Sequence, residues 1–67
     1  MAADEPEIMT TPEVAEHLRI PEATLHYWVH RGVAPPSVRL GKRRLYRREA
    51  VDAWLIERER AEAAVPA

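Results

Sequence analysis

Residues 9–32 read MTTPEVAEHLRIPEATLHYWVHRG and carry the signals of two short helices joined by a tight turn. Thr10 and Glu13 have the spacing of a capping box, in which each side chain accepts a hydrogen bond from the backbone of the other residue. Pro12 suits the first turn of a helix, where its missing N–H has no partner to lose. Apolar residues follow at helical spacing. We therefore predict a first helix from about Thr11 to Arg19.

A second helix is expected to begin near Glu22, directly after Pro21, with an acid where the helix dipole favours one. Gly32 suits the left-handed residue that commonly ends a helix. The buried stripe of this helix is expected to contain Leu25, Trp28 and Val29. Its opposite side carries polar and aromatic residues. Two helices of this kind are typical of a helix-turn-helix unit.

A small hairpin is expected after the second helix. Residues 34–36 contain two prolines and form a stiff extended connector. Residues 37–40 and 44–46 are short alternating runs, and the glycine-containing segment 41–43 between them predicts a three-residue loop. Three residues of the hairpin are expected to turn toward the core: Val38, Leu40 and Tyr46.

A last helix is expected from Arg48 to about Glu59. Its inner face is expected to contain Val51, Trp54 and Leu55. The order helix, helix, hairpin, helix defines a mainly α fold with a small β-hairpin, a winged helix-turn-helix. We predict one such domain over residues 8–58, with flexible or frayed termini at 1–7 and 59–67.

The charges are segregated along the chain, although the formal net charge is only -1. Residues 1–16 carry five acids and no base, residues 17–48 eight bases and one acid, and residues 49–67 five acids and two bases. Six of the bases lie within residues 39–48, the expected hairpin, without one acid. A charge run is most often a solvated face, but this concentration beside a helix-turn-helix indicates a polyanionic partner such as double-stranded DNA.

Two sets of side chains are candidate DNA contacts. Hydrogen-bonding side chains on a helix can read base edges in the major groove. The candidates on the second helix are Thr24, His26, Tyr27, His30 and Arg31. Cations on a hairpin suit phosphates or a narrow minor groove. The candidates there are Arg39, Lys42, Arg43 and Arg44. Partial burial against the hairpin is an alternative role for Tyr27.

Other chemistry has little support in the sequence. His26 and His30 have the spacing of paired metal ligands, but the chain has no cysteine, and exposed histidines on a DNA-facing helix are the preferred interpretation. Only the presence of imidazoles favours pH sensing. Ser37 is the single serine and lacks a base with an orienting partner. We expect no enzyme, no cofactor, no metal and no membrane segment.

Four segments together resemble a known family. Residues 9–18 and 20–28 resemble the opening of MerR-like helix-turn-helix modules, and residues 35–48 and 49–55 resemble the compact excisionase-type branch. The resemblance covers roughly residues 8–56. It implies that the second helix enters the major groove and that the hairpin wing follows the backbone or the adjacent minor groove. Carried over, it assigns recognition-helix roles to Thr24, His26 and Tyr27 and wing roles to Arg43, Arg44 and Tyr46. An arginine is common in the family where this chain has His26.

The resemblance implies a phage or mobile-element excisionase, a recombination directionality factor that bends DNA beside an attachment site and biases an integrase toward excision. The expected partners are double-stranded DNA, an integrase and neighbouring copies of the chain, without a small-molecule effector. A small transcriptional regulator of the same superfamily is the alternative. A protein-interaction module that docks its basic run on an acidic partner is a third possibility. We expect a cytoplasmic, nucleoid-associated location in a prokaryotic or phage-infected cell.

Overall fold

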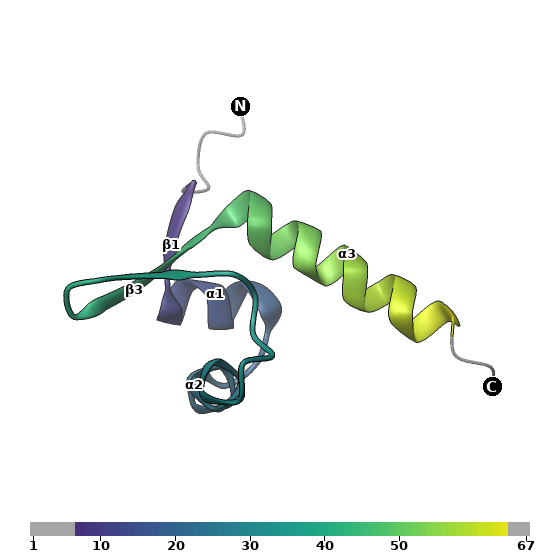
Figure 1. Cartoon of the computed structure of the whole chain (residues 1–67), viewed down its shortest axis with the longest axis horizontal. Coiled ribbons are helices and arrows are strands. Elements are labelled where there is room, and N and C mark those ends of the chain that lie inside the picture. The colour runs from purple at the N-terminus through teal and green to yellow at the C-terminus, as the bar shows by residue number, and fades with distance from the viewer. Residues whose placement is uncertain (1–6, 65–67) are drawn as a thin grey trace.

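The computed structural model describes residues 7–64, which form three helices and one three-stranded antiparallel sheet (Figure 1). The elements in chain order are β1 (Ile8–Thr10), α1 (Thr11–Leu18), α2 (Glu22–Arg31), β2 (Val38–Leu40), β3 (Arg43–Arg47) and α3 (Arg48–Ala64). The mainly helical winged helix-turn-helix fold is confirmed. The strand β1 is an addition that we did not predict.

The helix ends follow the local signals of the sequence. The Thr10 N–H donates to Glu13 Oε1 at 2.8 Å, and the Glu13 N–H donates to Thr10 Oγ1 at 3.4 Å, which confirms the capping box. α1 ends one residue earlier than expected because Arg19 adopts a left-handed conformation, with φ at 61°. Gly32 ends α2 with φ at 77°, as predicted.

The strand β3 is the centre of the sheet, with β1 on one side and β2 on the other. Met9 of β1 is paired with Tyr46 of β3. Leu40 is paired with Arg43, so the loop between β2 and β3 contains only Gly41 and Lys42. This loop is shorter than the predicted three-residue loop, because Arg43 already belongs to the ladder.

The register decides which side of the sheet each residue faces, because side chains alternate along a strand and paired residues share a face. Tyr46 faces the helices and is 1% exposed, which confirms its predicted role in holding the hairpin to the core. Val38 and Leu40 are paired with Leu45 and Arg43 of β3. These two positions of β3 alternate with Tyr46 along the strand, so Val38 and Leu40 face the opposite side of the sheet. They are 54% and 57% exposed, so the prediction that they turn inward is wrong.

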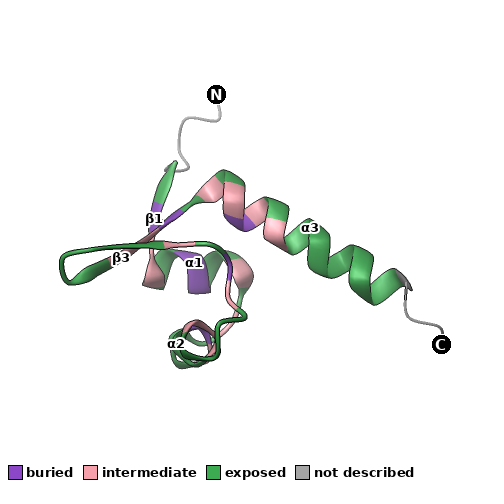
Figure 2. Ribbon diagram, viewed as in Figure 1, coloured by how far each residue is buried: buried purple, intermediate pink, exposed green. Residues whose placement is uncertain are grey.

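Five of the six elements supply a buried side chain to the core (Figure 2). The buried hydrophobic residues that form the core are Met9, Val14, Ala15, Leu25, Tyr46 and Val51. Trp28 and Trp54 are half-buried at the margin of this cluster, with ring centroids 6.1 Å apart. The expectation that both tryptophans belong to the core is therefore only partly right.

The helix α3 projects from the body, and its distal half is exposed (Figures 1 and 2). It continues to Ala64, so the expectation of a frayed terminus is wrong for residues 59–64. Of the other residues of the expected termini, Glu7 accepts a hydrogen bond at its carbonyl from the Arg48 N–H at 2.8 Å, and residues 1–6 and 65–67 lie outside the described part. Between residues 7 and 64, no helix is both long and apolar enough to cross a membrane.

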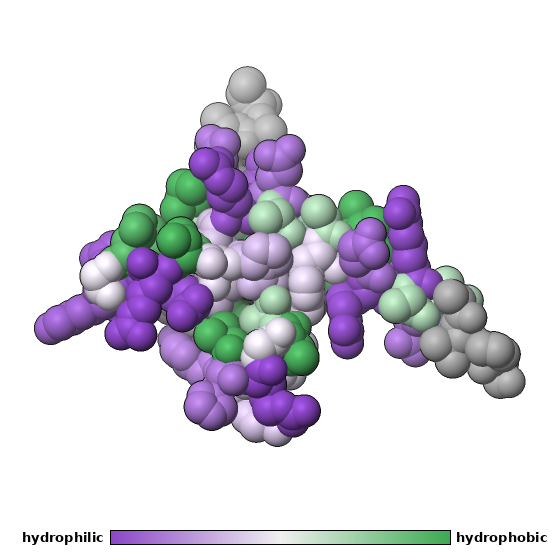
Figure 3. All heavy atoms as spheres, viewed as in Figure 1, coloured by the Kyte–Doolittle hydropathy of each residue, from purple (hydrophilic) through white to green (hydrophobic). Residues whose placement is uncertain are grey.

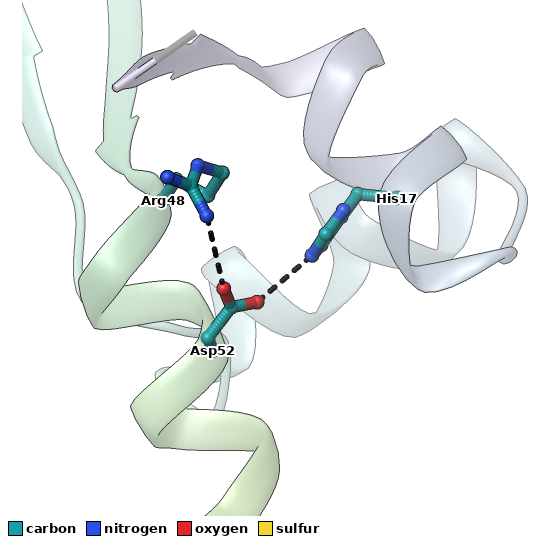
Figure 4. Close-up of polar contacts among 3 residues, drawn as sticks. All are labelled: His17, Arg48 and Asp52. Carbon is teal, nitrogen blue, oxygen red and sulfur yellow. Dashed lines mark hydrogen bonds and ion pairs between the residues drawn. The ribbon is translucent and has the colours of Figure 1, made fainter. Parts of the chain in front are cut away.

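Asp52 joins α1 to α3 at the surface (Figure 4). Its Oδ1 lies 2.9 Å from Nε2 of His17 on α1, and its Oδ2 lies 3.6 Å from Nη1 of Arg48 at the start of α3. Arg48, the last base of the basic run, therefore pairs with an acid of its own helix, and the contact of Asp52 with His17 joins α1 to α3.

Candidate nucleic-acid interface

The outward face of α2 presents the candidate base-reading residues. Leu25 is completely buried, which turns the side of the helix opposite it toward solvent. Four of the five candidates are exposed and Thr24 is half-buried; the exposed ones are His26, Tyr27, His30 and Arg31. Tyr27 is 56% exposed, so its alternative role as a side chain buried against the hairpin is wrong.

Tyr27 and Arg31 form a pair one turn apart on this face. Arg31 Nη1 donates to the Tyr27 hydroxyl at 2.8 Å, and the guanidinium carbon lies 5.6 Å from the ring centroid. This contact combines a hydrogen bond with a cation–π interaction. It holds the arginine in one orientation while the other guanidinium N–H groups can donate to a base edge or a phosphate.

The basic residues of the hairpin are divided between its two faces. Arg39 and Arg44 are paired across β2 and β3 and lie on the face that also carries Tyr46. Arg39 Nε donates to the Gly41 carbonyl at 3.3 Å, which holds its side chain near the tip of the hairpin. Lys42 and Arg43 are exposed, and among residues 7–64 neither forms an ion pair. Their charges are available to a phosphate backbone.

Arg44 is more constrained than the sequence suggested. It is half-buried, and its Nη1 donates to Ser37 Oγ at 2.7 Å. It also borders a depression of about 160 Å³ between the end of α2, at Val29 and Gly32, and the start of the hairpin. Arg44 therefore lies between the two candidate DNA-contacting elements. Ser37 was not predicted as a site residue, because its contact depends on how the two arms of the hairpin come together in space.

The start of α1 contributes to the same surface. Because Thr10 is paired with Leu45, the first residues of α1 lie beside the basic part of β3. A depression of about 220 Å³ is lined by Thr10, Thr11, Pro12, Lys42, Arg43 and Arg44. Three cations meet at this place beside the start of α1, and their charges can attract a DNA phosphate. The sequence contained the capping box but no sign of its position beside the hairpin.

One candidate lies outside the interface. Tyr46 is 1% exposed, so its assignment to a DNA-contacting wing position is wrong, and its ring belongs to the core. The two histidines of α2 remain at the surface, with His26 Nε2 at 3.4 Å from Glu22 Oε2. Within the described residues, no group of three or more His, Cys, Asp or Glu side chains could hold a metal ion.

The sequence was also compared with known proteins. A family model described as "Helix-turn-helix domain" matches residues 8–59, most of the chain. The match begins with β1 and ends within α3, so it contains both α2 and the hairpin. No curated protein and no solved structure matches this sequence.

Proposed function

Because this chain belongs to the helix-turn-helix domain family and is a DNA-binding protein, we propose that it serves as an excisionase. In this role it would bind beside an attachment site, bend the DNA and bias an integrase toward excision. The family includes excisionase-type DNA-binding proteins, which supports the proposal together with the MerR-like pattern of the sequence. The DNA strand exchange itself belongs to the integrase, so the proposal gives this chain no catalytic step.

The observation that carries the proposal is the combination of two surfaces. The exposed face of α2 offers polar side chains of the kind that read bases, centred on Tyr27 and Arg31. The hairpin, which projects from the body (Figure 1), adds the exposed cations Lys42 and Arg43. With α2 in the major groove, the hairpin would meet the backbone or the adjacent minor groove, and a protein that holds both can stabilise a bend.

The size of the module limits what one copy does. A single small DNA-binding module buries roughly 600–1,000 Å² of protein surface, which gives modest specific affinity. We therefore propose that several copies bind side by side and that the integrase is a further partner. We extend the proposal to a cytoplasmic, nucleoid-associated location in a prokaryotic or phage-infected cell, where such DNA lies.

The direct test is an in vitro excision reaction with the integrase encoded beside this gene, with and without the protein. We expect the excision product to depend on the protein, and circularly permuted fragments of the attachment site to show a bend. Arg43→Ala is expected to reduce excision because it removes an exposed wing cation. Arg60→Ala is the matched control, because Arg60 is exposed on α3 and lies away from the hairpin.

Other outcomes favour other functions. A protein that binds and bends its site but leaves excision unchanged, and that alters transcription from a neighbouring promoter, is a transcriptional regulator. A protein whose binding shows a small salt response and no dependence on DNA sequence is an interaction module that uses the basic hairpin for an acidic partner. Either result excludes the excisionase role.

A further inference from the structure

The face of the sheet that points away from the helices is apolar with two added arginines. This outer sheet face is defined by Ile8, Val38, Leu40, Arg43, Leu45 and Arg47, which share one side with Thr10 because of the register. Ile8, Val38 and Leu40 are 44%, 54% and 57% exposed. Figure 3 shows hydrophobic side chains gathered beside β1 and along the hairpin. Exposed apolar clusters edged by polar groups are typical of contact surfaces.

The outer sheet face also has a hollow. A depression of about 200 Å³ is lined by Pro36, Ser37, Val38, Leu45, Arg47 and Ala50. It lies where the sheet meets the first turn of α3. Arg47 at its border makes a long contact with Glu7, at 3.8 Å, and both side chains are mostly exposed. The hollow can therefore accept an apolar side chain from a partner, and an acid next to that side chain could pair with Arg47.

The distal half of α3 has the complementary character. Leu55 and Ile56 are 38% and 48% exposed, so the prediction that Leu55 lies on the inner face of the last helix is wrong, because this part of α3 projects from the body (Figure 1). Helical spacing places Glu59 and Glu62 on the same side of the helix, and both are exposed. The bases of this segment are engaged elsewhere: the Arg58 guanidinium lies 5.8 Å from the Trp54 ring centroid, and Arg60 forms an ion pair with Glu57 at 3.9 Å. We call Leu55, Ile56, Glu59 and Glu62 the α3 outer face.

We propose that the α3 outer face of one copy docks on the outer sheet face of a second copy. The apolar residues Leu55 and Ile56 would cover the exposed centre of the sheet. The two glutamates would face Arg47 at the border of the hollow, which leaves Arg43 to the DNA backbone. The charges also disfavour the symmetric alternatives. Two outer sheet faces are both basic and two α3 outer faces are both acidic, so each would repel its own kind.

The two faces are too far apart to meet within one molecule. In Figure 1 the hairpin and the end of α3 project from opposite ends of the protein, whose longest dimension is 41 Å. A contact between two different faces leaves one face of each kind free, so further copies can add in a row. The role of this contact on DNA rests on the proposed function. The contact itself can be tested with the protein alone.

The test uses one double variant of each face. The sheet variant carries Val38→Gln and Leu40→Gln, and the α3 variant carries Ile56→Gln and Glu59→Gln. All four positions are exposed, and thermal melting followed by circular dichroism checks that each variant folds. In sedimentation experiments we expect the wild type to associate as concentration rises and each variant alone to remain monomeric. An equimolar mixture should form one-to-one dimers, because it restores one intact pair of faces.

Symmetric contacts give a different pattern. If the sheet variant alone still dimerises, the contact joins two α3 helices. If the α3 variant alone still dimerises, the contact joins two sheets. Either result overturns the proposal, as does a mixture that stays monomeric at concentrations where the wild type associates.

DNA with two adjacent sites provides a second readout. We expect the second wild-type copy to bind roughly tenfold more tightly than the first, within the usual range for coupled binding. The α3 variant should bind a single site as the wild type does and should lose this cooperativity. Independent binding of two wild-type copies, together with a monomeric wild type, overturns the contact. Cooperative binding without any effect on excision removes the excisionase role and leaves the contact standing.

Discussion

The hydroxyl of Tyr46 is a buried polar group that finds no hydrogen-bond partner among the described residues. A buried donor without a partner loses its bonds to water on folding, at a cost of about 1–3 kcal/mol. We therefore expect Tyr46→Phe to raise the free energy of unfolding by about 1 kcal/mol, measured by urea denaturation. Tyr27→Phe is the matched control, because Tyr27 is exposed, and it should leave stability nearly unchanged. A less stable Tyr46→Phe protein would contradict this account.

Tyr27→Phe is expected to act on recognition. Without the hydroxyl, Arg31 loses the 2.8 Å hydrogen bond that fixes its orientation on the face of α2. We expect discrimination between target and random DNA to fall by about 1 kcal/mol, about fivefold, because a well-placed arginine contributes base readout. Competition binding with both DNAs measures this ratio. An equal loss of affinity for target and random DNA would assign the pair to the backbone.

The residues that the sequence predicted well are those whose roles are local. Thr10, Glu13 and Gly32 act through neighbours within a few positions, so their spacing alone predicts their conformation. Val38 and Leu40 are different because their direction depends on the register with β3. An alternating run shows that two faces exist but not which of them is buried.

At the scale of elements, the hairpin is expected to supply affinity and α2 to supply choice of sequence. Arg43→Ala should weaken binding to every DNA sequence and lower the slope of log affinity against log salt by about one unit, because one phosphate contact is lost. Arg60→Ala removes the same charge from the distal part of α3, and on DNA with a single site it should change neither quantity. A salt slope unchanged by Arg43→Ala would remove this residue from the interface.

The elements of the candidate interface were predictable, but their arrangement was only partly so. The segments of α2 and the hairpin carry strong signals in their capping residues, apolar stripe and basic charges. The three-residue strand β1 is too short to show a period, so the sequence indicates only a helix cap at its last residue, Thr10. Because β1 pairs with β3 and leads directly into α1, it helps to bring the start of α1 to Arg43 and Arg44. Without β1, the contribution of the α1 start to the interface could not be predicted from the sequence.

At the scale of the whole molecule, the small core sets a limit on stability. Six buried apolar residues form it, and a core in a domain of this size typically supplies only ~3–5 kcal/mol. The contact of Asp52 with His17 adds a link between α1 and α3, but both side chains are partly exposed, at 41% and 28%. Such a surface pair contributes only about 0–1 kcal/mol. DNA binding is therefore expected to be a substantial part of the stability of the working protein.

Leu25→Ala tests this coupling. Leu25 is completely buried on the inner side of α2, and truncation of a buried leucine costs roughly 2–5 kcal/mol, close to the whole stability expected here. We expect the variant to be largely unfolded at room temperature. Target DNA at about one hundred times the dissociation constant adds about 2.7 kcal/mol to the folded state and should restore much of its helical circular dichroism signal.

The matched control is Leu55→Ala on α3. Leu55 is 38% exposed, so the same truncation removes less buried surface and should leave the protein folded without DNA. Both variants keep Tyr27, Arg31 and the hairpin cations, so both retain the groups that contact DNA once folded. If saturating DNA raises the melting temperature of the wild type but does not restore helical signal to Leu25→Ala, the core and the interface are not coupled through folding. If Leu25→Ala melts like the wild type, the six-residue cluster is not the core that holds α2 in place.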